Sequence, residues 1–385
     1  MRIVSVVGTR PQLIKAAALL PALRAVHEEV FVDTGQHYDD ALAGTFFREL
    51  GLPHPEHTLD VRAETQGGQT AAMLAGVEEV LLNERPDAVL VYGDTNSTLA
   101  GTLAAAKLSI PVAHVEAGLR SFDRRMPEEV NRVVADHLSS WLFAPTPTAV
   151  ANLAAEGITD GVVLVGDLMQ DLAARVARDA ADPAVLAAVA ASLAQGAPGI
   201  RLEPGRFLYA TLHRAENRSS EALAAWAELV GSVASEDRPV VVATHPGTRV
   251  AMMRAGLELS PHVALVDPLG YRSSLALQLH AAAVLTDSGG VQRESAWLGT
   301  PCLVLRATTE WVEAVAGSEG RMVVIGLDRE RADRELERLA PPALAPALAR
   351  ERVATLDLQP AGAADAIVAG LGRPGRRLGP PTTGG

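Results

Sequence analysis

Short apolar runs alternate with longer helical segments along most of this chain. The runs are rich in β-branched residues and mix few polar positions among the apolar ones: 3–7, 29–32, 88–92, 112–115, 141–144, 162–165, 207–211, 240–243, 263–266, 282–286 and 302–306. Strands of this kind, separated by helices, are typical of parallel sheets covered on both faces. The pattern therefore predicts an α/β fold with two Rossmann-like, doubly wound domains.

The strand rhythm stops after residue 167, where an alanine-rich helical stretch begins. We therefore predict an N-terminal Rossmann-like domain over residues 1–168 and a C-terminal one over 169–354. The helix predicted at 355–371 is expected to join the first domain. Residues 372–385 are rich in Gly, Pro and Arg, and this composition predicts a disordered tail.

Composition and charge narrow the class of protein. A chain of 385 residues is too long for one core, and 48% apolar with 21% charged residues fits a globular protein. The net charge of −12 argues against a nucleic-acid or anionic-membrane partner. The apolar runs are shorter than a membrane span, and the N-terminus has the pattern of a strand rather than a signal peptide, so we expect a cytoplasmic location.

Several chemistries lack their motifs. No G-x-G-x-x-G follows a strand, and neither a Walker A pattern nor a G-x-S-x-G elbow occurs. No cluster of His, Cys and carboxylate residues has metal-ligand spacing, so no metal is predicted. The single cysteine, Cys302, lies in an apolar strand pattern and is interpreted as a packed apolar side chain.

The most informative stretch is Asp287-Ser288-Gly289-Gly290, which follows one predicted strand and opens a helix. A strand that turns through Ser-Gly-Gly into a helix presents backbone N–H groups and a positive dipole end to an anion. Glu294 lies about one turn inside that helix, on the face of the turn, where its carboxylate can accept hydrogen bonds from a sugar diol. A phosphate site beside a diol acceptor is what a nucleotide requires.

Other predicted strands also end in polar side chains. Ligands of open α/β sheets bind beyond the carboxyl ends of the strands, so a cleft between two such sheets would gather these groups into one site. The candidates are Arg10, Asp94, Glu116, His213, Arg214, His245 and Arg306.

Each candidate also has a structural interpretation. Arg10 and Lys15 suit phosphate oxygens but also an ordinary helix start, and Asp94 suits a helix N-cap. Glu116 interrupts an apolar segment, and a buried carboxylate is costly unless it is paired, which favours a role in a site.

Two further groups could have either a structural or a functional role. Pro127 fits the first position of a helix, where Glu128 would meet the helix dipole and could pair with Arg132 four residues on. His213 could hold a phosphate oxygen or transfer a proton near neutral pH, although a lone histidine is usually structural.

Taken together, the motifs resemble the UDP-N-acetylglucosamine 2-epimerase family in its non-hydrolysing branch. The matching segments are GTRP at 8–11, TGQHY at 34–38, YGDTNST at 92–98, HVEAGLR at 114–120, RMPEEVNR at 125–132, HRAEN at 213–217, DSGGVQ at 287–292 and TEWVE at 309–313. The resemblance runs from residue 1 to about 370 in the expected order.

The resemblance implies a fold like that of the B-type glycosyltransferases, with UDP held between two domains. It implies inversion at C2 of the sugar through elimination and re-addition of UDP, without a cofactor or metal, by a homodimer. It places the catalytic groups in the N-terminal domain, apart from one histidine, and UDP binding mainly in the C-terminal one. The implied catalytic residues are Asp94, Glu116, Glu128 and His213, and the implied UDP-binding residues are Arg10, Lys15, Arg132, His213, Arg214, Pro268, Tyr271, Ser288, Gly289, Gly290, Glu294 and Arg306.

The sequence departs from the family pattern at a few positions. Gln12 stands where members acting on UDP-N-acetylglucosamine commonly carry Glu, and it resembles relatives that epimerise 2,3-diacetamido-glucuronate nucleotides. Tyr38 stands where substrate-activated members tend to carry Arg, while Arg293 and Ser295 also differ from the usual residues. A related UDP-sugar, a hydrolysing epimerase, a glycosyltransferase and a non-catalytic sensor therefore remain alternatives to UDP-N-acetylglucosamine epimerisation.

Overall fold

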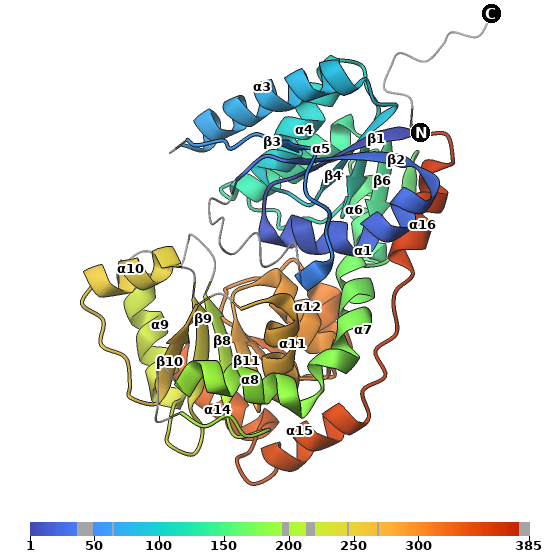
Figure 1. Cartoon of the computed structure of the whole chain (residues 1–385). Helices are drawn as coiled ribbons and strands as arrows, with labels where there is room; N and C mark the ends of the chain where they lie inside the picture. The colour runs from blue at the N-terminus through green and yellow to red at the C-terminus, as the bar shows by residue number, and fades with distance from the viewer. Residues whose placement is uncertain are drawn as a thin grey trace, which may run out of the picture. The chain divides into compact units, whose positions relative to one another are not determined.

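The computed structural model describes residues 1–36, 49–63, 65–194, 200–212, 220–244, 246–267 and 269–376. The chain divides into two compact units (Figure 1). Unit 1 comprises Met1–Leu172 and the segment that begins at Pro360, and unit 2 comprises Ala173–Gln359. The change of unit at Leu172 lies four residues after the boundary that the strand rhythm indicated.

Unit 1 is built on a 7-stranded parallel sheet with the order β3-β2-β1-β4-β5-β6-β7. The order reverses direction between β1 and β4, as in a doubly wound sheet, and ligand sites of this fold lie beyond the carboxyl ends of strands at such a point. The strands are β1 Arg2–Val7, β2 Glu28–Asp33, β3 His57–Thr58, β4 Ala88–Tyr92, β5 Val112–Val115, β6 Trp141–Ala144 and β7 Val162–Leu164.

Helices cover both faces of this sheet, because its strands are apolar on both sides. Valines of β1, β2 and β4 pack against α3 and α4 on one face. The other face carries α1 and α16, where Gly370 lies against the ring of Phe143 (Figure 1). The helices are α1 Arg10–Val26, α3 Gln66–Glu84, α4 Asn96–Lys107, α5 Pro127–Leu138, α6 Pro147–Ala155 and α16 Ala363–Leu371, and α7 Leu168–Ala180 spans the change of unit.

Unit 2 repeats the architecture with a 6-stranded parallel sheet of order β10-β9-β8-β11-β12-β13. Its strands are β8 Leu208–Leu212, β9 Val240–Thr244, β10 Val263–Val266, β11 Ala283–Thr286, β12 Cys302–Val304 and β13 Met322–Val324. Its helices are α8 Pro183–Ala194, α9 Ser220–Val233, α10 Pro246–Arg254, α11 Tyr271–His280, α12 Gly289–Trp297, α13 Val312–Gly317, α14 Arg329–Leu339 and α15 Ala345–Ala354.

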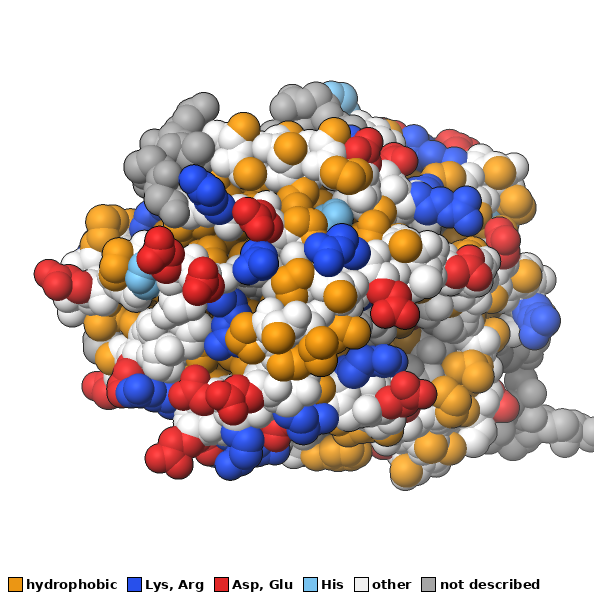
Figure 2. All heavy atoms as spheres, turned by 90° about the horizontal axis from the view of Figure 1, so that it is seen from below, with side chains coloured by type: hydrophobic (Ala, Val, Ile, Leu, Met, Phe, Trp, Pro, Cys, Tyr) orange, Lys and Arg blue, Asp and Glu red, His pale blue; other side chains and the backbone are white. Residues whose placement is uncertain are grey.

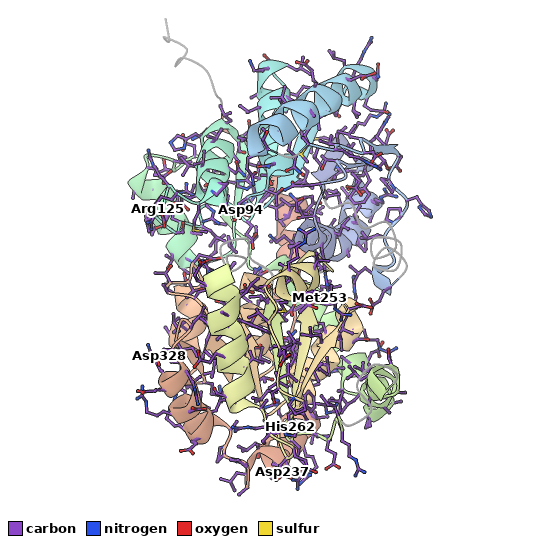
Figure 3. All side chains as sticks on the ribbon, turned by 90° about the vertical axis from the view of Figure 1, so that its left-hand side faces the viewer. Asp94, Arg125, Asp237, Met253, His262 and Asp328 are labelled. Carbon is purple, nitrogen blue, oxygen red and sulfur yellow. The ribbon has the colours of Figure 1, made fainter. Side chains whose placement is uncertain are left out.

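Two apolar cores sandwich the sheet of unit 2. Trp226 of α9 and Leu336 of α14 lie in the core on one face, and Leu186 of α8 and Leu277 of α11 lie in the core on the other. In Figure 3, Met253 near the end of α10 marks one end of this unit, and Asp237 and His262 mark the opposite end, where β9 and β10 begin. Cys302 is buried in β12, and burial raises the pKa of its thiol to about 12, which agrees with a packed apolar role.

The predicted α/β fold with two doubly wound sheets is confirmed. The sequence missed β3 and β13, because strands of two or three residues carry too little pattern to be recognised. The single helical stretch expected after residue 167 is two helices, α7 and α8, with a turn at Ala181 and Asp182 between them.

The prediction of a disordered tail from residue 372 is wrong for its first five residues. The indole N–H of Trp141 donates to the carbonyl of Arg373 at 2.9 Å, and the N–H of Arg376 donates to the carbonyl of Ser140 at 2.8 Å. A Cβ on Gly375 would lie 2.9 Å from the Trp141 ring, so glycine allows this close packing. Composition cannot reveal such tertiary contacts. Residues 377–385 lie outside the described part of the chain.

Charged side chains of both signs are interspersed over the face seen in Figure 2, rather than gathered into one basic surface. This distribution differs from the basic patch of a nucleic-acid-binding face. Within the described ranges, no helix combines the length and the apolar character needed to cross a bilayer.

Candidate active site

Two strand ends of unit 1 carry candidate carboxylates on unusual turns. Gly93 follows β4 with φ 63°, and its N–H donates to the carbonyl of Val115 at 2.9 Å. Glu116 follows β5 with φ 71°, a conformation that is uncommon for a residue with a side chain. Backbone strain of this kind is found at functional sites, where the surrounding structure must hold it in place. Both turns lie at the carboxyl edge of the sheet, as the sequence indicated.

Lys15 and Glu116 form an ion pair at this edge. Their side chains are 7% and 11% exposed, so the pair is largely removed from water but still reachable. An ideal Cβ on Gly93 would lie 3.0 Å from Nζ of Lys15, which explains why glycine occupies the turn above the pair. Lys15 thus supplies the partner that a buried Glu116 needs, and the resemblance alone had implied only a contact with the diphosphate.

A second ion pair joins Asp94 to Arg132 of α5. Arg132 is buried and also pairs with Glu129, whose carboxylate lies 2.8 Å from Nη1. The side-chain amide of Asn131 donates to the carbonyl of Asp94 at 2.9 Å. Figure 3 labels Asp94 after β4 and Arg125 in the segment that precedes α5.

Asp94 is not the N-cap of the next helix. Thr95 occupies that position, and Thr95 and Thr98 bond reciprocally in a capping box. The hydroxyl of Thr95 therefore supplies the cap, and the Asp94 carboxylate is directed to Arg132. The structural interpretation of Asp94 that the sequence left open is thus wrong.

Glu128 lies in the first turn of α5 and is half-buried, and its neighbour Glu129 is buried. Glu129 accepts hydrogen bonds from the N–H groups of Ser121 and Phe122 at 2.9 and 3.0 Å. Burial by itself would raise the pKa of Glu129, but these bonds and the charge of Arg132 outweigh it and lower the pKa. Glu129 is therefore a buried carboxylate that fixes the start of α5, while Glu128 is the glutamate of this pair that solvent can reach.

Gln12 belongs to the framework of the fold. Its side-chain amide donates to the carbonyl of Tyr92 at 2.8 Å and to the hydroxyl of Thr98 at 3.0 Å. Its oxygen accepts from the N–H groups of Gly8 and Thr9 at 2.9 and 3.2 Å. Gln12 thereby joins the start of α1 to the end of β4 and is itself fully buried, and Arg10 begins α1 beside it.

In unit 2, Ser288 stands at the N-cap position of α12 without a side-chain capping hydrogen bond, and Gly289 and Gly290 form the first turn of this helix. The first N–H groups of a helix have no acceptor within the helix, so this end offers donors to an anion. A Cβ on Gly289 would lie 2.9 Å from Nε1 of Trp311, so the indole closes over the turn. The guanidinium of Arg293 stacks on the same indole, 3.7 Å from the ring centroid.

Among the other predicted residues of unit 2, Glu294 and Arg306 have partners inside it. Glu294 is buried and accepts a hydrogen bond from the amide of Gln278 at 2.6 Å. Arg306 is buried and pairs with Glu310 at 2.7 Å. Tyr271 begins α11 and is buried. His213, Arg214 and Pro268, together with His245, lie outside the described residues.

Sequence reasoning missed part of this arrangement. His114 and Asp136 form a fully buried pair under the turns of Asp94 and Glu116, and Trp311 covers the turn of Ser288. The spacing of Glu129, Arg132 and Asp136 was an available signal, because residues three and four apart share one face of a helix. Polar residues along the buried face of a helix indicate a network. Across the described ranges, no three His, Cys, Asp or Glu side chains are grouped so as to hold a metal ion.

Two doubly wound α/β units, with carboxylates paired to cations at one strand edge and a helix start with open N–H groups at another, have the architecture expected of an enzyme that acts on a nucleotide sugar. Comparison with known proteins narrows this class. The model of the UDP-N-acetylglucosamine 2-epimerase family matches residues 22–355. The chain therefore belongs to this family, and it is an epimerase of UDP-sugars, an isomerase.

Three relatives illustrate the match. The chain is 44% identical over 336 residues to the UDP-2,3-diacetamido-2,3-dideoxy-D-glucuronate 2-epimerase of Pseudomonas aeruginosa, covering 86% of this chain and 90% of that protein. It is 39% identical to the UDP-N-acetylglucosamine 2-epimerase of Methanocaldococcus jannaschii, covering 88% and 92%. The crystal structure of a Methanocaldococcus jannaschii enzyme in complex with UDP-GlcNAc and UDP superposes with a TM-score of 0.82 at 35% identity, covering 97% and 99%.

Proposed function

We propose that this protein interconverts UDP-N-acetylglucosamine and UDP-N-acetylmannosamine without hydrolysis. The observation that carries the proposal is the pairing of Glu116 with Lys15 and of Asp94 with Arg132 at one strand edge of unit 1. These two carboxylates lie on the turns that follow the neighbouring strands β5 and β4, each beside a cation and each within reach of solvent. Inversion at carbon needs proton transfer on two faces, so it needs more than one such group.

The proposed reaction is an elimination followed by an addition. A base removes the proton from C2, the C2 electrons form the C1–C2 double bond, and the bond from C1 to UDP breaks. The products are a glycal and UDP, which stay bound. A proton then returns to the other face of C2 while UDP attacks C1, so that atoms and charge balance and no redox partner is needed.

The weak acidity of the C2–H bond decides where the protein must help. Fixed donors that stabilise the departing diphosphate lower the barrier most. We assign this task to the first turn of α12, at Ser288, Gly289 and Gly290, together with Arg10 and, by resemblance, His213 and Arg214. Within unit 2, Arg293 adds a positive charge beside that turn. Glu294, Tyr271, Pro268 and Arg306 are proposed to complete the nucleotide site.

The carboxylates of unit 1 are proposed to handle the protons. Glu116 and Asp94 come from the turns after β5 and β4, and Glu128 comes from the first turn of α5. Lys15 forms an ion pair with Glu116, and Arg132 forms one with Asp94, so each of these carboxylates has a cation beside it. The resemblance adds His213 as a further acid or base.

A second sugar substrate is favoured by one comparison. The relative at 44% identity acts on UDP-2,3-diacetamido-2,3-dideoxy-D-glucuronate. Gln12, which suggested this substrate from the sequence, has its amide and carbonyl engaged by the backbone and Thr98. Its influence on the sugar would therefore act through the shape of the turn after β1, rather than through direct contact.

The deciding experiment is deuterium incorporation. We expect UDP-N-acetylglucosamine incubated with the protein in D2O to gain deuterium at C2 and to equilibrate with its manno epimer, as read by proton NMR. The same assay with the diacetamido-glucuronate nucleotide compares the two substrates. Absence of exchange at C2 with both nucleotides contradicts the proposal.

The same samples distinguish the other activities. Steady release of free UDP without an acceptor indicates a hydrolysing epimerase. UDP release that requires an added acceptor indicates a glycosyltransferase, and UDP binding without turnover indicates a sensor. A homodimer and a cytoplasmic location remain predictions from the resemblance and the composition, and analytical ultracentrifugation tests the first of them.

A further inference from the structure

A buried ion network lies beneath the two turns of unit 1 that carry Asp94 and Glu116. His114 of β5 and Asp136 of α5 are at its centre, and both side chains are fully buried. Nδ1 of His114 lies 2.7 Å from Oδ1 of Asp136, and Nε2 lies 2.7 Å from the carbonyl oxygen of Gly93. His114 thus connects helix α5 to the turn that precedes Asp94.

The partners of His114 determine its charge. The Gly93 carbonyl can only accept a hydrogen bond, so Nε2 must carry a proton. Oδ2 of Asp136 accepts from the N–H of Gly118 at 3.0 Å and from Nη1 of Arg120 at 2.7 Å, and a guanidinium at this distance favours the carboxylate form of Asp136 over the acid. Nδ1 must therefore also carry a proton, and a ring with two N–H groups is an imidazolium.

Arg120 is a second cation beside Asp136. Burial by itself would raise the pKa of Asp136, but the charges and hydrogen bonds of His114 and Arg120 outweigh burial and lower that pKa. Arg120 also pairs with Glu156 at 2.6 Å, and Arg376 donates to the carbonyls of Asp136 and His137 at 3.4 and 2.7 Å. With His114 charged, two cations face two carboxylates at the centre of the network, as a buried network requires.

Asp136 reaches both turns through the network. Its Oδ1 acts through His114 on the carbonyl of Gly93, the residue before Asp94. Its Oδ2 holds the N–H of Gly118, two residues after Glu116. Glu116 has a positive φ, which needs support from its surroundings. The Asp136 carboxylate therefore supports both turns. One of its oxygens acts through His114 on the turn that bears Asp94, and the other holds the turn that bears Glu116.

We propose that His114 is a positioning residue, held as an imidazolium by Asp136, that fixes the turn bearing Asp94 in register with the turn bearing Glu116. The inference rests on the proposed function for the roles of Asp94 and Glu116. The charge of His114 is inferred from its hydrogen-bond partners and from the cation beside Asp136, not from the proposed function, so it can be tested separately. His114 itself is buried and does not contact substrate in this assignment.

The first test reads the charge state. In protein labelled with 15N at histidine, two-bond proton–nitrogen spectra at pH 7.5 are expected to show both ring nitrogens of His114 as N–H. The His114→Gln spectrum assigns the signal, and the exposed His54 supplies an internal comparison. In Asp136→Asn, the amide can donate to Nδ1 and accept from Gly118, so the His114 signal should become that of a neutral ring. A neutral ring in the unmodified protein overturns the proposal.

The second test reads positioning through a pair of amide variants. An asparagine side chain places its N–H near Nδ1 of the ring, and a glutamine places it near Nε2. His114→Asn therefore keeps the bond to Asp136 and loses Gly93, while His114→Gln keeps Gly93. We expect His114→Asn to lower kcat by about 10²-fold through misplacement of the Asp94 turn, with KM and the Kd for UDP changed far less, and His114→Gln to retain more activity.

The outcomes separate this inference from the proposed function. Equal activity of His114→Asn and the unmodified protein overturns the positioning role, whatever the spectra show. Circular dichroism and UDP titration check that each variant folds. If His114→Asn does not fold, the activities of His114→Gln and Asp136→Asn are compared with that of the unmodified protein instead. If the unmodified protein exchanges no deuterium at C2, the proposed function fails, and the spectra still decide the charge of His114.

Discussion

Single side chains in this protein act through the partner that the fold assigns to them. Glu116 would be a costly buried charge alone, and Lys15 makes it stable at the sheet edge. Gly93 leaves room for that pair, because a Cβ would lie 3.0 Å from the ammonium group. The sequence singled out Glu116 and Lys15 separately, but no pattern in it joins a residue of the turn after β5 to a residue of α1.

At this scale we predict the effect of Glu116→Gln. The amide keeps the size of the side chain but cannot take up a proton, so kcat should fall by about 10²- to 10⁴-fold, the usual contribution of a general acid or base. UDP binding should be retained, because the diphosphate site is assigned mainly to unit 2. Isothermal titration with UDP and the C2 exchange assay measure the two effects. Full turnover by this variant would show that Glu116 is not the proton carrier.

At the scale of elements, helix starts organise both units. Pro127 opens α5, Thr95 caps α4 and Ser288 stands at the N-cap position of α12, all at or next to positions that the sequence marked. These signals are local, so they could be predicted. The contact of Trp311 with the first turn of α12 could not be predicted. It joins this helix to the segment that follows β12, and it depends on the path of the chain in three dimensions.

Gly289→Ala tests the start of α12. Its methyl group would lie 2.9 Å from Nε1 of Trp311, so the indole or the turn must move, and we expect weaker UDP binding. Gly231→Ala in α9 is the matched control, because a Cβ there meets no atom within 4 Å. The control should keep the Kd for UDP and gain about 0.5–1 kcal/mol of stability from helix propensity. An unchanged Kd in Gly289→Ala would remove this turn from the nucleotide site.

For the whole molecule, the buried acids make the free energy of unfolding depend on pH. Some of them favour the folded state less as pH falls, and one favours it more. Glu129 and Asp136 have pKa values below their ordinary 4.5 and 3.8, because hydrogen bonds and neighbouring cations outweigh burial. The unfolded chain then binds more protons than the folded one, so stability is lost as pH falls through this range. Burial raises the pKa of Glu29, despite its ion pair with Arg24, and this group acts in the opposite direction.

Urea unfolding between pH 7 and pH 3 checks these signs. For Glu129→Gln we expect lower stability at pH 7 and a shallower loss below pH 4.5, since the lowered pKa of Glu129 no longer contributes. For Glu29→Gln we expect a steeper loss over the acid range, because the variant no longer has the raised pKa that opposes it. If the free energy of unfolding falls with pH in both variants as it does in the unmodified protein, the assignment of these pKa shifts is contradicted.

Local patterns along the chain were enough to predict the fold class, most strand positions, the helix starts and the candidate groups at the strand ends. These follow from hydrophobic period and turn chemistry, which act over a few neighbouring residues. The three-dimensional fold sets which charges pair: Lys15 with Glu116, Arg132 with Asp94, and His114 with Asp136. It also decided that the chain after Leu371 packs on β6. Such contacts join residues far apart in the sequence, and their energy depends on burial and distance, which no local pattern records.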